Sequence, residues 1–215
     1  MRGRFITFEG IEGSGKSTQV ARLAAWLGDD DCDRLVTREP GGTGLGRRLR
    51  AVLLEGDSVA RAREPLTEAL LMVADRAEHV ASVILPALDQ GTVVLCDRHA
   101  DSTLAYQGGG SGVALETLRA LNGIATRGLV PDLTLLYDLE PAVALARMRA
   151  RTGGAADRFE AESLAFHQRV RAAYLALAQA EPGRFAVIDA ARPADSVFAD
   201  TRARVAALLG RPATP

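Results

Sequence analysis

The chain has 215 residues, of which 47% are hydrophobic and 25% charged, a composition typical of a globular, soluble protein with one α/β domain. Its 26 basic and 27 acidic side chains give a formal net charge of −1, so no global field would attract nucleic acid or an anionic membrane. No stretch approaches the ~20 apolar residues of a membrane span, and the spacing of Cys32 and Cys96 fits neither a metal site nor a redox pair. We therefore expect a cytoplasmic protein with free thiols, and with neither nucleic acid nor a membrane as a partner.

The first predicted strand, residues 5–8, runs into a glycine-rich motif and then into a helical pattern. The motif GIEGSGKS, from Gly10 to Ser17, has the form G-x-x-x-x-G-K-S, and its flanking strand and helix are the context of a P-loop. Glycines allow positive φ, so consecutive N–H groups can surround a phosphate at the helix N-terminus. Lys16 would bind the β- and γ-phosphates, and Ser17 would ligate Mg²⁺. The expected triphosphate-binding residues of this stretch are Gly10, Ile11, Glu12, Gly13, Ser14, Gly15, Lys16, Ser17 and Thr18.

Four further apolar runs alternate with helical patterns, at residues 34–37, 92–96, 133–137 and 185–188. This alternation predicts an α/β fold: a P-loop NTPase-type five-stranded parallel sheet flanked by helices on both faces, with a short helical lid. We expect a single domain over residues 1–209, with the lid at about 147–160, and a frayed tail over residues 210–215. Ligands of such sheets bind at the carboxyl ends of the strands, so the residues after each run are candidates for function.

The second strand is followed by TREPGGT, residues 37–43, whose Pro-Gly-Gly turn would lie at the ligand edge of the sheet. Arg38 has the planar fork that suits a phosphate. A surface turn with an exposed pair of Arg38 and Glu39 is an equally good interpretation of this stretch alone.

A long helix is predicted over residues 65–88, with Pro65 in its first turn and Pro86 bending or ending it. Its apolar stripe has a period near 3.6 and consists of Leu66, Leu70, Val73, Ala77, Val80, Ile84 and Leu88. Met72, Arg76 and His79 fall on another face. A solvated charge is the usual role of an arginine such as Arg76, and exposure is also favoured for His79, since nothing near it suggests a ligand or a base.

The third strand ends in Asp97 and Arg98. An apolar strand that closes on aspartate is typical of a Walker-B-like carboxylate near Mg²⁺, and Arg98 adds a second phosphate-binding fork. Gly108, Gly109 and Gly110 follow soon after. We therefore expect this segment to be a loop in close approach to a ligand and not part of the core.

The fourth strand is followed by a helix that carries Arg147 and Arg151, which are four residues apart and share a face. Gly153 and Gly154 interrupt this helix. Arginines beside a glycine hinge indicate a mobile phosphate clamp, although runs of Ala and Arg also form plain solvent-facing helices. Two further helices are predicted, over residues 161–180 and 194–209.

Four motifs in this order make the chain resemble the bacterial thymidylate kinases, P-loop nucleoside-monophosphate kinases that make dTDP from dTMP and ATP in dTTP biosynthesis. The motifs are FEGIEGSGKST, TREPGGT, DRHADSTLAYQGGG and RMRARTGGAADRFE, and the resemblance covers essentially the whole chain. Many enzymes share the P-loop, whereas the second and third motifs are close to diagnostic. The resemblance implies ATP and dTMP as substrates, Mg²⁺ as cofactor and a homodimer.

The resemblance also implies roles for residues on the dTMP side. Arg38 and Arg98 would hold the acceptor phosphate, and Arg76 would bind the thymine carbonyl. Contacts to base and sugar, which help to exclude ribonucleotides, would come from Thr103, Tyr106 and Gln107. Met72 stands where many members carry a phenylalanine that stacks on thymine. Its thioether can cover a ring face, but it is flexible and lacks the aromatic quadrupole.

On the ATP side, the implied catalytic residues are Lys16, Asp97, Arg98 and Arg151, and the implied metal ligands are Ser17 and Asp97. Acidic Glu12 and the lid arginines resemble the family variant in which Arg151 reaches the transferring phosphoryl group. Arg147 would lie against adenine, and the loop around Arg192 would complete the adenine site. Glu12 would face the sugar hydroxyl of dTMP or the metal, and a solvent-facing position is the alternative.

Two other classes of function stay open. A kinase of the same fold could act on dUMP, another monophosphate or a deoxynucleoside, although the pair of Arg38 and Arg98 favours a phosphorylated acceptor. A P-loop switch or motor would need an element that orients the attacking water, and we find no glutamine or switch motif placed for that role.

Overall fold

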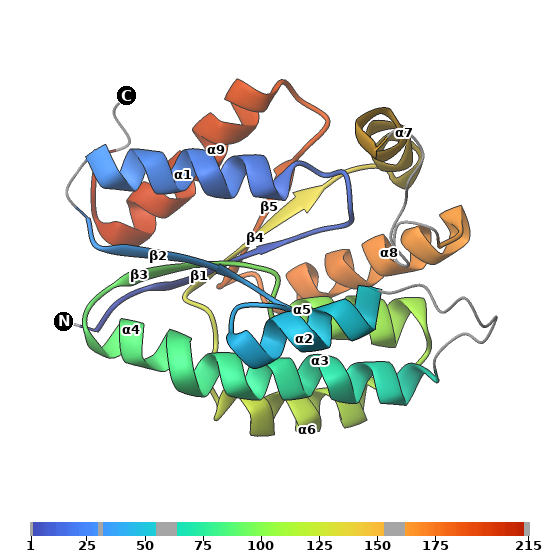
Figure 1. The fold of residues 1–215 in the computed structure, drawn as a ribbon. Coiled ribbons are helices and arrows are strands. Elements are labelled where there is room, and N and C mark those ends of the chain that lie inside the picture. The colour runs from blue at the N-terminus through green and yellow to red at the C-terminus, as the bar shows by residue number, and fades with distance from the viewer. Residues whose placement is uncertain (1, 30–31, 55–63, 153–161, 213–215) are drawn as a thin grey trace.

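The computed structural model describes residues 2–29, 32–54, 64–152 and 162–212 (Figure 1). Its sheet has five parallel strands in the order β2-β3-β1-β4-β5, which confirms the predicted fold class. The strands are β1 (Phe5–Glu9), β2 (Arg34–Arg38), β3 (Val93–Asp97), β4 (Leu133–Asp138) and β5 (Phe185–Asp189). Each strand extends one residue beyond its apolar run, because the polar residue at its carboxyl end still pairs with a neighbouring strand.

Helices cover both faces of the sheet (Figure 1). On one face, α1 (Lys16–Asp29) packs against α9 (Ala194–Leu209). The other face carries α3 (Pro65–His79), the π-helical segment η1 (Val80–Ile84), α4 (Leu85–Asp89), α5 (Ala100–Thr103), the π-helical segment η2 (Leu104–Gly110), α6 (Leu115–Thr126) and α8 (Leu164–Ala180), and α2 (Gly44–Leu54) lies against α3. The helix α7 (Pro141–Thr152) lies beside the P-loop, at the edge where the strands end.

One helical rod runs from Pro65 to Asp89 and passes through η1 just before Pro86. Within the π-helical segment the bonding register widens, and the Leu85 N–H donates to Val80 O. A proline has no N–H and clashes with the preceding turn of a regular α-helix. The wider turn therefore accommodates Pro86, and the helix continues beyond it.

The apolar stripe of this rod faces the core only in its second half. Val80, Ile84 and Leu88 are buried as predicted, but Leu66 and Leu70 are 39% and 47% exposed. The buried side of α3 is largely polar and includes Glu68, Asp75, Arg76 and His79. This side packs against α5, α6 and η2. The first half of the predicted stripe is therefore on the outer side of the helix, and the prediction was wrong there.

His79 is fully buried, so its predicted exposure was wrong. Its Nδ1 lies 2.9 Å from Glu39 Oε1, and its Nε2 lies 2.6 Å from Thr37 Oγ1. Both partners belong to β2 and the turn that follows it. No pattern within the helix could have indicated these contacts.

The segment from Gly108 to Gly110 is helical and mostly buried, so the predicted loop was also wrong. It forms the end of η2, which packs against α8. A Cβ atom added at Gly109 would lie 2.5 Å from Ala173 Cβ, and one added at Gly110 would lie 2.5 Å from Phe166 Cε2. The glycines are required because two helices meet closely here.

The later helices follow the prediction closely. The helix α9 has the predicted bounds, whereas α8 begins at Leu164, where Ser163 Oγ accepts a bond from the Phe166 N–H and caps the helix. Cys32 and Cys96 are free thiols as predicted, and Cys96 is buried. Among the described helices, none is long and apolar enough to cross a bilayer. The predicted glycine hinge and the last residues of the tail lie outside the described residues.

Candidate active site

The P-loop has the expected backbone. Gly10, Gly13 and Gly15 have φ of +134°, +77° and +89°, which residues with a Cβ atom rarely adopt. Lys16 is buried, and its Nζ donates to Gly10 O at 2.8 Å and to Ile11 O at 2.9 Å. Burial, with the nearby charge of Arg98, lowers the pKa of Lys16 to about 8. The loop therefore holds the Lys16 ammonium group with its own carbonyl oxygens.

A cavity beside this loop, here called the P-loop cavity, brings together residues from three strand ends, those of β1, β2 and β3, and from α2 and α7. It is lined by Glu12, Gly13, Gly15, Lys16, Ser17, Thr18, Arg38, Glu39, Arg50, Asp97, Arg98, Arg147 and Met148. Ser17 Oγ donates to Asp97 Oδ2 at 3.0 Å. A hydroxyl and a carboxylate this close fit Mg²⁺, which takes few hard oxygen ligands from a protein and completes its shell with water and phosphate.

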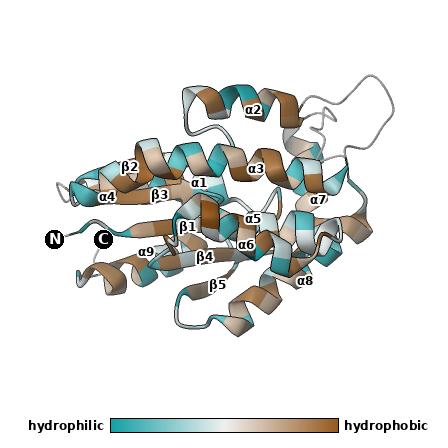
Figure 2. Ribbon diagram, turned by 90° about the horizontal axis from the view of Figure 1, so that it is seen from below, coloured by the Kyte–Doolittle hydropathy of each residue, from teal (hydrophilic) through white to brown (hydrophobic). Residues whose placement is uncertain are grey.

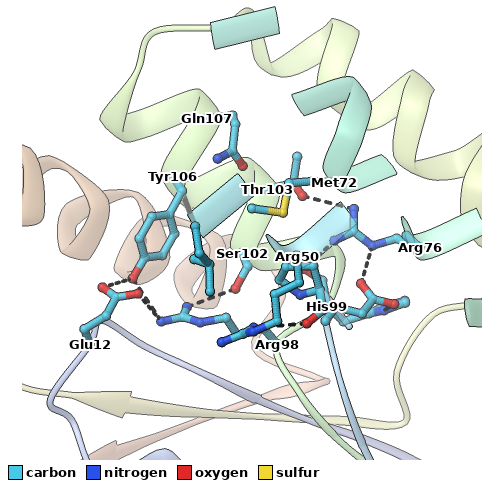
Figure 3. Close-up of a pocket in the computed structure, with 13 residues that line it drawn as sticks. Glu12, Arg50, Met72, Arg76, Arg98, His99, Ser102, Thr103, Tyr106 and Gln107 are labelled. Carbon is cyan, nitrogen blue, oxygen red and sulfur yellow. Dashed lines mark hydrogen bonds and ion pairs between the residues drawn. The ribbon is translucent and has the colours of Figure 1, made fainter. Parts of the chain in front are cut away.

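A second cavity, here called the inner cavity and drawn in Figure 3, shares lining residues with the first. It is lined by Glu12, Glu39, Pro40, Arg50, Leu54, Met72, Arg76, Arg98, His99, Ser102, Thr103, Tyr106 and Gln107. Glu12, Glu39, Arg50 and Arg98 line both cavities and so form their boundary. Apart from Arg38, which lines the P-loop cavity, the residues expected on the dTMP side all line the inner cavity.

Arg98 is the central side chain of this boundary (Figure 3). Its guanidinium donates to Glu12 Oε1 at 2.6 Å, Tyr106 OH at 3.1 Å, Ser102 Oγ at 3.2 Å and Tyr174 OH at 3.2 Å. Its backbone has φ of +70°, in the left-handed region that favours glycine. The backbone is therefore strained at Arg98, the residue whose guanidinium lies between the two cavities.

Glu12 is not solvent-facing, so that alternative was wrong. Its side chain is 17% exposed, it pairs with Arg98, and Tyr106 OH donates to its Oε2. Burial raises the pKa of Glu12, but Arg98 and Lys16 outweigh burial, and the pKa falls below its ordinary value. The carboxylate therefore stays ionised at neutral pH and holds Arg98 and Tyr106 in place.

Arg76 is 2% exposed, so the solvated charge usual for a helix arginine does not apply. Its guanidinium donates to Glu39 Oε2 at 2.8 Å, Thr103 Oγ1 at 3.0 Å, Asn122 Oδ1 at 2.6 Å and His99 O at 3.0 Å. A guanidinium has five N–H groups, so these four bonds leave one more donor on a side chain that lines the inner cavity.

Glu39 connects Arg76 to two buried histidines. Its Oε1 lies 2.9 Å from His79 Nδ1 and 3.0 Å from His99 Nδ1. Although burial raises the pKa of Glu39, His99 and Arg76 hold it well below its usual range. Glu39 is thus part of a buried network. The alternative considered from the sequence, an exposed pair of Arg38 and Glu39 on a surface turn, was wrong for Glu39.

Two arginines expected to bind phosphate or adenine lie at the P-loop cavity. Arg38 is exposed and pairs in the sheet with Asp97, which brings it to the same edge as Arg98. Arg147 Nη1 donates to Ala190 O at 3.0 Å, which joins α7 to the loop after β5. Both positions agree with a polyphosphate site, and the individual roles stay predictions.

The two remaining arginines of the expected ATP site are Arg151 and Arg192. Arg192 forms an ion pair with Asp200, and it lines neither the P-loop cavity nor the inner cavity. Arg151 belongs to the last turn of α7, but its side chain lies outside the described part of the chain.

Comparison with known proteins identifies the family. The family model for thymidylate kinase matches residues 8–201. The chain belongs to the thymidylate kinase family. Proteins named thymidylate kinase from Desulfovibrio desulfuricans and Ralstonia nicotianae are each 53% identical to it, over 96% and 97% of this chain and 97% and 100% of their own lengths. A third, from Carboxydothermus hydrogenoformans, is 46% identical over 98% of this chain and 100% of its own length.

Several polar residues around the two cavities of this thymidylate kinase family member were not predicted from the sequence. They are Glu9, Arg50, Glu68, His99, Asn122 and Tyr174. Glu9 is the last residue of β1, so the rule that functional residues lie at strand ends could have found it. Arg50, Asn122 and Tyr174 lie on three different helices, where no local pattern distinguishes them from other polar residues.

Glu9 is fully buried behind Arg98. Its Oε1 accepts a bond from the His99 N–H at 2.8 Å, and its Oε2 accepts bonds from Ser102 Oγ at 2.6 Å and Tyr174 OH at 2.8 Å. Ser102 and Tyr174 are also partners of Arg98. Burial, with a smaller effect of Asp101, raises the pKa of Glu9 to about 7.

A Glu9→Gln variant should therefore be less sensitive to pH than the wild type. The folded-state pKa of Glu9 lies above the unfolded value, so its contribution to stability is complete below about pH 4.5 and is lost as pH rises through about 7. Between pH 5 and 8 the wild type should lose about 2 kcal/mol of unfolding free energy relative to E9Q. Urea unfolding at both pH values measures this difference. The control variant is E78Q, because Glu78 is exposed. The prediction would be contradicted if the unfolding free energies of the wild type and E9Q changed equally with pH.

Proposed function

We propose that the protein transfers the γ-phosphoryl group of ATP to dTMP, giving dTDP and ADP for dTTP biosynthesis. The observation that carries this proposal is the shared boundary of the two cavities, with Arg98 at its centre. A triphosphate on the P-loop would meet, at this boundary, the phosphate of a nucleotide whose base occupies the inner cavity. The names of the relatives, all thymidylate kinases, support the same reaction.

On the donor side, Lys16 would exchange its carbonyl partners for the β- and γ-phosphates of ATP. Ser17 and Asp97 would hold Mg²⁺, whose charge neutralises the phosphates when the ion is bound. The glycine N–H groups and the N-terminus of α1 would bind further phosphate oxygens.

On the acceptor side, Arg38 and Arg98 would bind the phosphate of dTMP. The remaining N–H of Arg76 would donate to a thymine carbonyl, while Met72 would cover the base. Tyr106, held by Glu12, would lie against the sugar. The ion pair of Glu12 and Arg98 keeps the phosphate-binding guanidinium oriented before the substrate arrives.

Phosphoryl transfer needs two anions aligned and the charge of the transferring group stabilised, and it requires no general base in this scheme. Arg98 at the boundary and Arg151 from the lid would supply that charge, with Lys16 on the other side. Closure of the lid would exclude water and so suppress hydrolysis of ATP.

ADP formation from ATP and Mg²⁺ tests the proposal, with dTMP, dUMP, thymidine, dCMP or dGMP as acceptor, or with no acceptor. We expect by far the highest kcat/KM with dTMP and almost no ADP without an acceptor. Preference for dUMP or thymidine would indicate a related kinase. Equal turnover without any acceptor would contradict the transfer reaction and favour a P-loop switch.

We further propose that the protein is a homodimer. Apolar residues recur along α2, α3 and α6 (Figure 2), and the exposed ones on these helices are Leu45, Val52, Leu66, Leu70, Leu115 and Ile124. Exposed apolar surface of this kind is typical of protein interfaces. Sedimentation velocity should give twice the mass of one chain at micromolar concentration, and a monomer there would contradict the dimer.

A further inference from the structure

A buried hydrogen bond lies behind the inner cavity, between η2 and α3. Gln107 Nε2 donates to Glu68 Oε1 at 2.8 Å. Both side chains are 2% exposed, yet only Gln107 lines the cavity, and Glu68 lies behind it. Figure 3 shows the Gln107 side chain extending toward Thr103 and Met72.

The chemistry of this pair determines which end of the amide faces the cavity. An ionised carboxylate accepts hydrogen bonds and has none to donate, so the NH₂ group of Gln107 must be the one that meets Glu68. The reverse orientation would press the amide oxygen against a carboxylate oxygen, so that neither group could donate to the other in a buried place. Glu68 therefore directs the Gln107 carbonyl oxygen to the cavity side.

Arg76 presents the opposite polarity to the same cavity. Its guanidinium can only donate, and one N–H is left after the four bonds to Glu39, Thr103, Asn122 and His99. The cavity thus combines one fixed donor with one fixed acceptor. A 4-oxo pyrimidine such as thymine matches this pair, since O4 accepts and N3–H donates, whereas a 4-amino pyrimidine has the reverse pattern.

We propose that Glu68 is a positioning residue for substrate selection: by fixing the amide of Gln107, it makes the inner cavity select 4-oxo over 4-amino pyrimidine nucleotides. The inference rests on the proposed dTMP kinase function. Glu68 itself would touch no substrate, and it would act only through Gln107.

The test is the ratio of kcat/KM for dTMP to kcat/KM for 5-methyl-dCMP, which differs from dTMP only in the atoms at N3 and C4. In Glu68→Gln, the new amide can either accept from Gln107 or donate to it, so the Gln107 amide is free to turn. We expect the ratio to fall about tenfold in E68Q. It should stay at the wild-type value in Glu78→Gln, which removes an exposed carboxylate from the same helix, and in Glu68→Asp, which keeps an acceptor-only group.

A merely structural role for Glu68 would lower kcat/KM for both nucleotides alike, and an unchanged ratio in E68Q would overturn the inference. If E68Q does not fold, Gln107→Met carries the test, because it removes the amide through which Glu68 acts. A fall in the ratio in Q107M supports the inference, and an unchanged ratio overturns it. A wild type that does not phosphorylate dTMP would instead overturn the proposed function, which separates the two failures.

Discussion

The Arg151→Ala variant is expected to lose about a thousandfold or more in kcat, the scale of effect of an arginine that stabilises a transferring phosphoryl group. Arg151 follows Arg147 by one helical turn, so the two share a face of α7, and Arg147 lines the P-loop cavity. The charge that Arg151 would neutralise develops in the transition state, so kcat should fall far more than the affinity for ATP. Steady-state ADP formation with saturating dTMP measures the effect.

Arg149→Ala is the matched control for this prediction. Arg149 is exposed and lies two residues from Arg151, on the opposite side of the same helix. Its loss removes the same charge from the helix face opposite to Arg147, so turnover should stay near that of the wild type. Near-normal turnover in R151A, or an equal loss in both variants, would show that the lid does not supply the catalytic arginine.

The sheet and the P-loop could be predicted because their signals are local. A buried parallel strand is a short apolar run, and the loop's positive φ angles at Gly10, Gly13 and Gly15 require glycines at this spacing. The strand-end rule then selected Arg38, Asp97 and Arg98, which the sheet register brings to one edge.

The polar network behind the site could not be predicted in the same way. Arg76 and Glu39 are 37 positions apart, and Glu9 and Tyr174 are 165 positions apart, so only the folded chain brings them together. Periodicity was misleading on α3, because this helix buries a polar side that packs around a cavity and exposes much of its apolar side. A sequence pattern cannot separate a core-facing stripe from one that faces outward.

The Arg98→Ala variant should lose about a thousandfold in kcat/KM for dTMP, because it removes the guanidinium that both cavities share. It should also be destabilised. Glu12 would remain mostly buried without its ion-pair partner, and the Tyr106 and Tyr174 hydroxyl groups would each lose a bond. The pKa of Glu12 should rise in this variant, since Arg98 is the largest influence that lowers it.

Arg98→Gly separates the side chain from the backbone. Glycine adopts the φ of +70° found at this position without the strain that alanine carries. The free energy of unfolding of R98G should therefore be about 1 kcal/mol higher than that of R98A. Both variants lack the guanidinium, so both should lose the same kcat/KM for dTMP. A recovery of activity in R98G would mean that the backbone turn after β3, and not the charge, supports the reaction. If R98A and R98G have equal activity but R98G is more stable, the loss of activity is due to the missing guanidinium. The strained backbone of Arg98 then serves to position that guanidinium between the two nucleotides.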